Sequence, residues 1–107
     1  MLIDTNVKAF KNFINNEWQE SASEQVIPSI NPANKEEIVG FVQNSTVEDL
    51  EKAVLAAHQA KKNWRKMGQA ARGQLLFKAA NIVEENLDEI AETLTREMGK
   101  TLTEAKG

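Results

Sequence analysis

The chain has 107 residues, with 13 Lys and Arg against 16 Asp and Glu, so its formal net charge is −3. Hydrophobic residues make up 41% of it and charged residues 27%, which is typical of a folded globular chain rather than a disordered one. There is no cysteine, which excludes disulfides, thiolate metal sites and a thiolate nucleophile. The length is that of one domain, or of part of one.

The sequence also limits the partners and the cellular compartment that we expect for this chain. No apolar run approaches the roughly 18 residues of a membrane helix. The N-terminus also lacks the charged and then apolar pattern of a signal peptide. We therefore expect a cytoplasmic chain with no membrane partner. The mildly acidic balance and the lack of a basic stripe predict no nucleic-acid partner.

The first 44 residues have the pattern of β-structure. Residues 1–9 show no periodicity and are predicted to be a disordered N-terminus. Over residues 10–44 we expect a β-hairpin and a further strand. Asn15 and Asn16 separate two strand-like runs, which predicts a tight turn. The run 38–43 is rich in β-branched and aromatic residues and is the best candidate for a strand, with an unpaired edge.

Residues 45–107 have helical periodicity and are predicted to form three to four amphipathic helices. The first three are expected at about 46–67, 70–85 and 87–98. The fourth begins at Thr101 and is cut short by the end of the chain. The fold class is therefore an α+β fragment, with a β-hairpin and strand followed by helices.

Individual residues mark where these helices begin and end. Ser45 or Thr46 is a candidate N-cap for the first helix, because an acidic residue follows three positions later. Gly68 and Gly99 are expected to end helices in the left-handed conformation. Asn86 is expected to end the second helix and to cap the third.

Apolar side chains cover more of the second helix than one neighbouring helix hides. The members of this set are Leu75, Leu76, Ala79, Ala80, Ile82 and Val83. We therefore expect the chain to associate with itself. Trp64 shares a face with Val54 and Ala57, and we expect it to be a buried packing residue. His58, in an alanine-rich helical run, is interpreted as a solvated or half-buried residue without a catalytic role.

Five short motifs in order resemble the N-terminal region of the aldehyde dehydrogenase superfamily. The motifs are Phe13-Ile14-Asn15-Asn16-Glu17-Trp18, Ile30-Asn31-Pro32-Ala33, the stretch from Ser45 to Ala57, Trp64 with Arg72 and Leu75-Leu76, and Glu97-Met98-Gly99-Lys100. Asn16 departs from the glycine that the family favours, but asparagine also tolerates the left-handed conformation. The resemblance spans nearly the whole chain.

The resemblance implies that the chain is part of a larger α/β aldehyde dehydrogenase fold. Such a full-length parent oxidises an aldehyde to a carboxylic acid with NAD or NADP. The family's catalytic Cys, general-base Glu and oxyanion-holding Asn all lie downstream of the matched motifs. We therefore expect no catalytic and no cofactor-binding residue here, and a chain that is inactive alone and binds no cofactor. The runs 39–46 and 96–107 look most like the α-ketoglutarate semialdehyde (2,5-dioxopentanoate) dehydrogenase branch, with succinate semialdehyde the nearest competing substrate.

The resemblance also implies one metal site. In the family the acidic residue matched by Glu97 binds a monovalent cation together with backbone carbonyls, which correspond to those of Ser29 and Ile30. The alternative is a solvated Glu97 that pairs with Lys100 or Arg96. Arg72 either pins the second helix or is an exposed helical residue.

A different class of function also fits the pattern. A free-standing helical adaptor domain would bind a partner protein through the same apolar stripes. A monomer in which the chain itself covers the second helix would favour the adaptor, whereas self-association would favour the fragment of a dehydrogenase.

Overall fold

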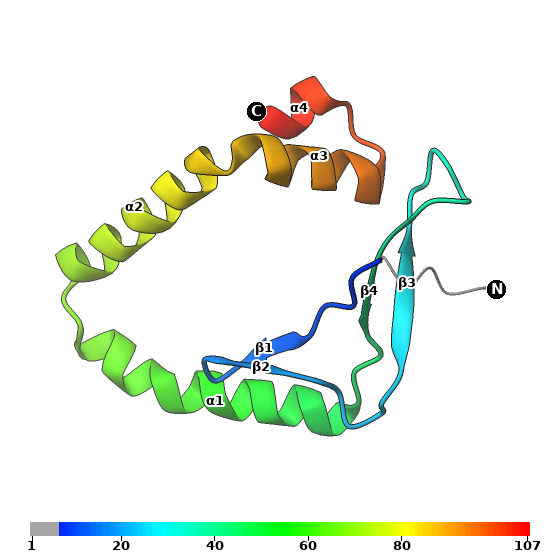
Figure 1. Ribbon diagram of the computed structural model, residues 1–107. Helices are drawn as coiled ribbons and strands as arrows, with labels where there is room; N and C mark the ends of the chain where they lie inside the picture. Colours follow the sequence, from blue (N-terminus) through cyan, green and yellow to red (C-terminus); the bar gives the residue numbers. More distant parts are fainter. Residues whose placement is uncertain (1–6) are drawn as a thin grey trace.

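The computed structural model describes residues 7–107, which form two β-hairpins followed by a series of helices along an open arc (Figure 1). The strands lie on one side of the arc, and α1, α2 and α3 follow one another around the rest of it. The elements are β1 (Asn12–Ile14), β2 (Glu17–Gln19), β3 (Val26–Ile30), β4 (Ile38–Gln43), α1 (Val47–Lys66), α2 (Gln69–Glu85), α3 (Leu87–Met98) and α4 (Leu102–Lys106). The predicted α+β order is confirmed.

The first hairpin joins β1 and β2 through a two-residue turn. Asn15 and Asn16 have φ angles of 53° and 63°, the left-handed pair that such a turn requires. The register places Phe13 opposite Trp18, and their rings are 4.9 Å apart between centroids. The asparagine pair therefore folds the chain back as the sequence predicted.

The second hairpin pairs β3 with β4 in antiparallel register, with a bulge between Ser29 and Ile30. The expected unpaired edge of β4 is wrong around Phe41. Phe41 accepts a hydrogen bond from the Phe10 amide at 2.8 Å and donates one to the Lys8 carbonyl at 3.0 Å. Of the segment predicted to be disordered, residues 1–6 lie outside the described residues, whereas Ala9 forms a bridge with Phe41. The chain just before β1 is thus held against the second hairpin.

α1 begins at a complete capping box. Thr46 Oγ1 accepts from the Asp49 amide at 3.2 Å, and Asp49 Oδ2 accepts from the Thr46 amide at 2.8 Å. The expected left-handed stop at Gly68 is wrong. Met67 ends α1 in an extended conformation, and Gly68, with φ −57°, is the N-cap of α2. Only Met67 and Gly68 separate the two helices.

α2 and α3 are joined by a single residue. Asn86 is the C-cap of α2 and the N-cap of α3, but its side chain donates to the Ile82 carbonyl and does not cap α3. α3 ends as predicted at Gly99, which has a φ of 80°. The Thr101 hydroxyl then caps α4 by accepting from the Glu104 amide.

The described residues enclose almost no hydrophobic core. Phe41 and Ala91 are their only buried apolar side chains, with 7% and 1% of their surface exposed. The expectation that Trp64 is buried is wrong, because 44% of its surface is exposed and no other element covers that face of α1. The radius of gyration is 17.2 Å, against about 13 Å for a compact chain of this length.

Within residues 7–107, no helix is long and apolar enough to cross a membrane.

Candidate functional site

The end of α3 meets the second hairpin at the three residues that the sequence singled out as a metal site. Ser29 Oγ donates a hydrogen bond to Glu97 Oε1 at 2.8 Å, across 68 positions of sequence. Ile30 follows directly, on the other side of the β3 bulge. Glu97 is exposed and Ser29 is half-buried, so the contact lies at the rim of the interface rather than within it. The structure thus brings Ser29 and Glu97 together.

A second group of polar side chains holds this junction from the side. Glu37 accepts from Arg96 Nε at 2.6 Å and from Asn31 Nδ2 at 2.8 Å. The hydrogen bond from Asn31, followed by the hydrogen bond and the charge of Arg96, lowers the pKa of Glu37 below its usual value. Asn31 Oδ1 in turn accepts from the Ala33 amide and fixes the turn through Pro32. The alternative in which Arg96 pairs with Glu97 is therefore wrong.

Two glycines allow close contacts around this junction, one between the end of α3 and the turn at Pro32 and one between β4 and the segment before β1. Gly99, just after α3, lies so near the ring of Pro32 that an added Cβ would stand 3.2 Å from its Cγ. Gly40 in β4 lies against the Phe10 ring in the same way, at 2.8 Å. A cavity of about 360 Å³ remains beside the contact, with Ser29, Arg96 and Glu97 among the side chains that line it.

The donor atoms of this junction are those that an alkali cation prefers. Hard cations bind oxygen ligands, and the junction offers a carboxylate and a hydroxyl beside a helix end whose carbonyls carry partial negative charge. Glu97 adds a further negative charge there, while its cationic neighbour Arg96 is engaged by Glu37. The residues present therefore fit part of a cation site. Within the described residues, no cluster of three or more His, Asp or Glu side chains is arranged to hold a metal.

A second junction ties the other end of the arc to the β-structure. The side chain of Asp49 is buried in α1 and accepts from Ser21 Oγ at 2.5 Å and from the Ala22 amide at 3.3 Å, besides its role in the capping box. The hydrogen bond from Ser21 is the main reason that the pKa of Asp49 falls from 3.8 to about 2. Ser21 is also buried, and its amide donates to Gln43 Oε1 of β4 at 2.8 Å. Asp49 thus joins α1 to the loop after β2, and Ser21 joins that loop to β4.

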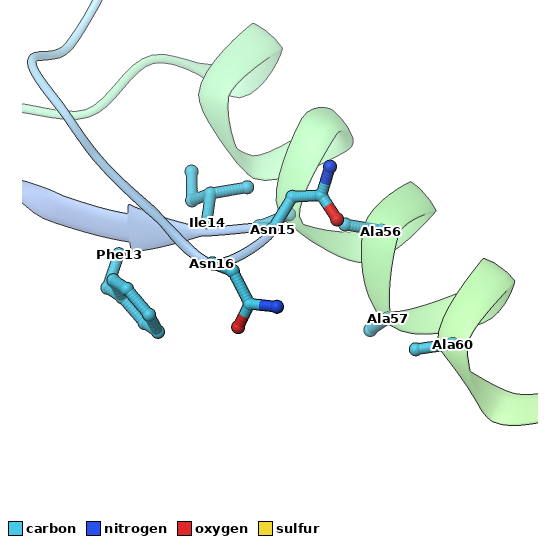
Figure 2. Close-up of a pocket in the computed structure, with 8 residues that line it drawn as sticks. Phe13, Ile14, Asn15, Asn16, Ala56, Ala57 and Ala60 are labelled. Carbon is cyan, nitrogen blue, oxygen red and sulfur yellow. The ribbon is translucent and has the colours of Figure 1, made fainter. Parts of the chain in front are cut away.

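The first hairpin rests on the alanine-rich face of α1 (Figure 2). Asn15 reaches α1 beside Ala56, while Asn16 and Phe13 extend along a cavity of about 320 Å³ next to Ala57 and Ala60. Alanines at these positions let the turn approach the helix backbone. The cavity carries no charged side chain among its lining residues, so it offers packing space rather than chemistry.

Arg72 and His58 are the other residues that the sequence singled out. Arg72 Nη1 donates to the Met67 carbonyl at 2.6 Å, so it pins the start of α2 to the end of α1, the first of its two predicted roles. His58 is exposed on α1, as the sequence indicated. Sequence reasoning missed Ser21 and Glu37, because a serine in a polar loop and a glutamate in a turn give no signal until their partners are known.

Comparison with known proteins defines the class of molecule to which these junctions belong. The model of the aldehyde dehydrogenase family matches residues 18–107. The chain is 54% identical over its full length to an alpha-ketoglutaric semialdehyde dehydrogenase of Bacillus subtilis (strain 168), and 43% identical over 106 residues to a malonate-semialdehyde dehydrogenase of Bacillus cereus (strain B4264). It spans 22% of the length of each.

Solved structures agree. An NAD-dependent aldehyde dehydrogenase from Sinorhizobium meliloti superposes on 97% of this chain with a TM-score of 0.88 at 28% identity, and the match takes up 22% of that protein. The structure of a 3,6-anhydro-L-galactose dehydrogenase matches with a TM-score of 0.87 over 92% of this chain. The chain belongs to the aldehyde dehydrogenase family and corresponds to its N-terminal segment.

Proposed function

We propose that this chain supplies the N-terminal segment of an NAD(P)-dependent dehydrogenase that oxidises an aldehyde to a carboxylic acid. One observation carries the proposal. All 107 residues of this chain align with a relative from the family, and yet the chain encloses almost no core of its own. The surface that it leaves exposed is what a segment of a larger fold presents to the rest of that fold. A free-standing adaptor would need a core to hold its binding face, and Phe41 and Ala91 do not make one.

The substrate that we propose is a semialdehyde, and α-ketoglutaric semialdehyde is the first candidate. The support is the 54% identity to a relative of that name, against 43% to a malonate-semialdehyde dehydrogenase. The chain has no cysteine for attack on an aldehyde and no glycine-rich phosphate loop. The catalytic and cofactor-binding groups would therefore come from other parts of the enzyme, and this segment's role would be structural.

The test is a chimera in which this chain replaces the matching segment of the Bacillus subtilis relative. We expect NADH production with α-ketoglutaric semialdehyde, at a rate within about tenfold of the parent, because 54% identity preserves most packing contacts. The relative without any N-terminal segment is the control and should be inactive. A folded chimera without activity would contradict the proposal. So would saturable NADH production by the 107-residue chain alone.

The second part of the proposal concerns Ser29, Ile30 and Glu97, which would contribute a carboxylate and backbone carbonyls to a monovalent cation site in the full enzyme. It rests on the Ser29–Glu97 contact and on the negative end of α3 beside it. In the chimera, potassium in place of a bulky organic cation should raise the thermal midpoint, and Glu97→Gln should remove that rise. An equal response of both proteins to potassium would exclude Glu97 as a ligand.

A further inference from the structure

Arg96 and Glu97 are adjacent in the chain and carry opposite charges, yet they do not pair. Both line the cavity of about 360 Å³ at the end of α3. Arg96 Nε donates instead to Glu37 Oε1 at 2.6 Å, while the Glu97 carboxylate accepts from Ser29 Oγ at 2.8 Å. Within residues 7–107, no Lys or Arg nitrogen lies within 4.0 Å of a Glu97 oxygen. The cationic side chain next to Glu97 in sequence is therefore directed to another carboxylate.

Glu37 is held in place by contacts other than the one with Arg96. Its second carboxylate oxygen, Oε2, accepts from Asn31 Nδ2 at 2.8 Å. Its backbone is held as well, because its amide donates to the Asn34 carbonyl at 2.9 Å and its carbonyl accepts from the Asn31 amide at 3.0 Å. The side chains of Glu37 and Arg96 expose only 32% and 39% of their surface. This ion pair is therefore more strongly oriented than an ordinary surface pair, and it keeps the guanidinium at the turn between β3 and β4.

The charges at this junction suit one monovalent cation. Glu37 and Glu97 each carry a negative charge, and Arg96 carries a single positive one. Because Arg96 is paired with Glu37, the charge of Glu97 is the one left without a cationic partner in the part of the chain that the structure describes. A bound monovalent cation would balance that charge, whereas a divalent one would exceed it.

Without the Glu37 carboxylate, Arg96 would have Glu97 as its nearest available partner. Adjacent residues of a helix point about 100° apart, but these two lie near the end of α3, where both side chains reach the same cavity. The arginine side chain is long and flexible enough to turn towards the neighbouring carboxylate. A guanidinium placed there would satisfy Glu97 and repel a bound metal ion.

We propose that Glu37 is a positioning residue of the cation site, which holds Arg96 away from Glu97 and so keeps the Glu97 carboxylate available to a monovalent cation. The inference rests on the cation site proposed above and adds what controls it. In this arrangement Arg96 is a competitor of the metal ion within the same chain. The contact between Glu37 and Arg96 determines which of the two cations Glu97 binds. The affinity for the ion then depends on a residue that is not itself a ligand.

The test uses the full-length chimera described above, and its readout is the thermal midpoint rather than enzyme activity. The midpoint is followed as potassium replaces a bulky organic cation at constant ionic strength, which gives an apparent dissociation constant for potassium. Glu37→Gln should raise this constant about tenfold or more, because Arg96 then turns to Glu97. Glu36→Gln removes the same charge from the exposed neighbour in the same turn. It is the matched control and should leave the constant unchanged.

A double variant separates this competition from a merely structural role of Glu37. Adding Arg96→Gln to Glu37→Gln should return the constant to that of the unmodified chimera, because no guanidinium remains to compete with potassium. If Glu37 only stabilised its turn, the second substitution would leave potassium binding weak or weaken it further. The midpoint of each variant without potassium reports its folding separately.

Failure of this inference is distinguishable from failure of the proposed cation site. The site stands and the role of Glu37 is overturned if Glu97→Gln abolishes the potassium response but the double variant does not recover it. The same holds if Glu37→Gln binds potassium as tightly as the unmodified chimera. Both proposals are overturned if Glu97→Gln responds to potassium like the unmodified chimera, or if the chimera shows no response at all.

Discussion

The ends of the helical arc and its middle are held in opposite ways. At one end, Asp49 joins α1 to the β-structure, and at the other, Glu37 and Arg96 with Ser29 and Glu97 join α3 to it. α2, between them, has no buried residue and its main contact is with the adjacent α3. Polar contacts between distant residues therefore hold the two ends of the arc, and the hydrophobic burial of this segment lies at Phe41 in β4 and Ala91 in α3 rather than in α2.

If this contrast is right, the largest effect should come from the one large apolar side chain that the second hairpin buries. Phe41→Ala should cost about 3–5 kcal/mol in the free energy of unfolding, which is a large fraction of the roughly 5–15 kcal/mol that stabilises a typical domain. We expect loss of the cooperative transition in urea. Phe77→Ala, in uncovered α2, is the matched control and should change stability by less than about 0.5 kcal/mol. Similar losses in both variants would mean that α2 is covered in solution.

Two glycine-to-alanine substitutions, one after α3 and one in α2, should change the stability in opposite directions. Gly99→Ala forces a left-handed alanine beside Pro32, which should destabilise the chain by about 1–2 kcal/mol. Gly73→Ala, in α2, meets no atom within 4 Å and should stabilise it by about 0.5–1 kcal/mol, since glycine is a poor helix former. Thermal unfolding followed at 222 nm measures both. Destabilisation by Gly73→Ala would show that another surface packs against α2.

The smallest effect is expected from acid, because it acts only at low pH. The pKa of Asp49 is lowered from 3.8 to about 2, so its contribution is complete above about pH 4 and is lost as the pH falls towards 2. The lowered pKa of Glu37 acts in the same direction. We expect the thermal midpoint to fall over this range, and to fall less in Asp49→Asn. Glu51→Gln, an exposed change on the same helix, should keep the slope of the unmodified chain.

The sequence predicted the elements of this fold well, because their signals are local. The Asn15–Asn16 turn, the strand at 38–43 and the end of α3 at Gly99 each depend on the preferences of neighbouring residues. The prediction for Trp64 was wrong for a different reason. An apolar face shows that a helix buries something, but it does not show whether the covering element lies within the same chain.

The candidate site was predictable only in part. The family resemblance pointed to Ser29, Ile30 and Glu97, and the structure places Ser29 against Glu97. The pairing of Glu37 with Arg96 that holds them there gave no signal, because the two residues are 59 positions apart and the sequence suggested Glu97 as the partner of Arg96.

The single-residue connection at Asn86 has a mechanical consequence. With both ends of the arc fixed to the β-structure, α2 acts as a strut about 25 Å long between two anchored members. Deleting one residue from it would shorten the strut by about 1.5 Å and rotate everything beyond it by about 100°. The anchors at Asp49 and Arg96 could not then be satisfied together. The length of α2 is therefore fixed by the anchors at its two ends, so insertions and deletions within it should be tolerated poorly.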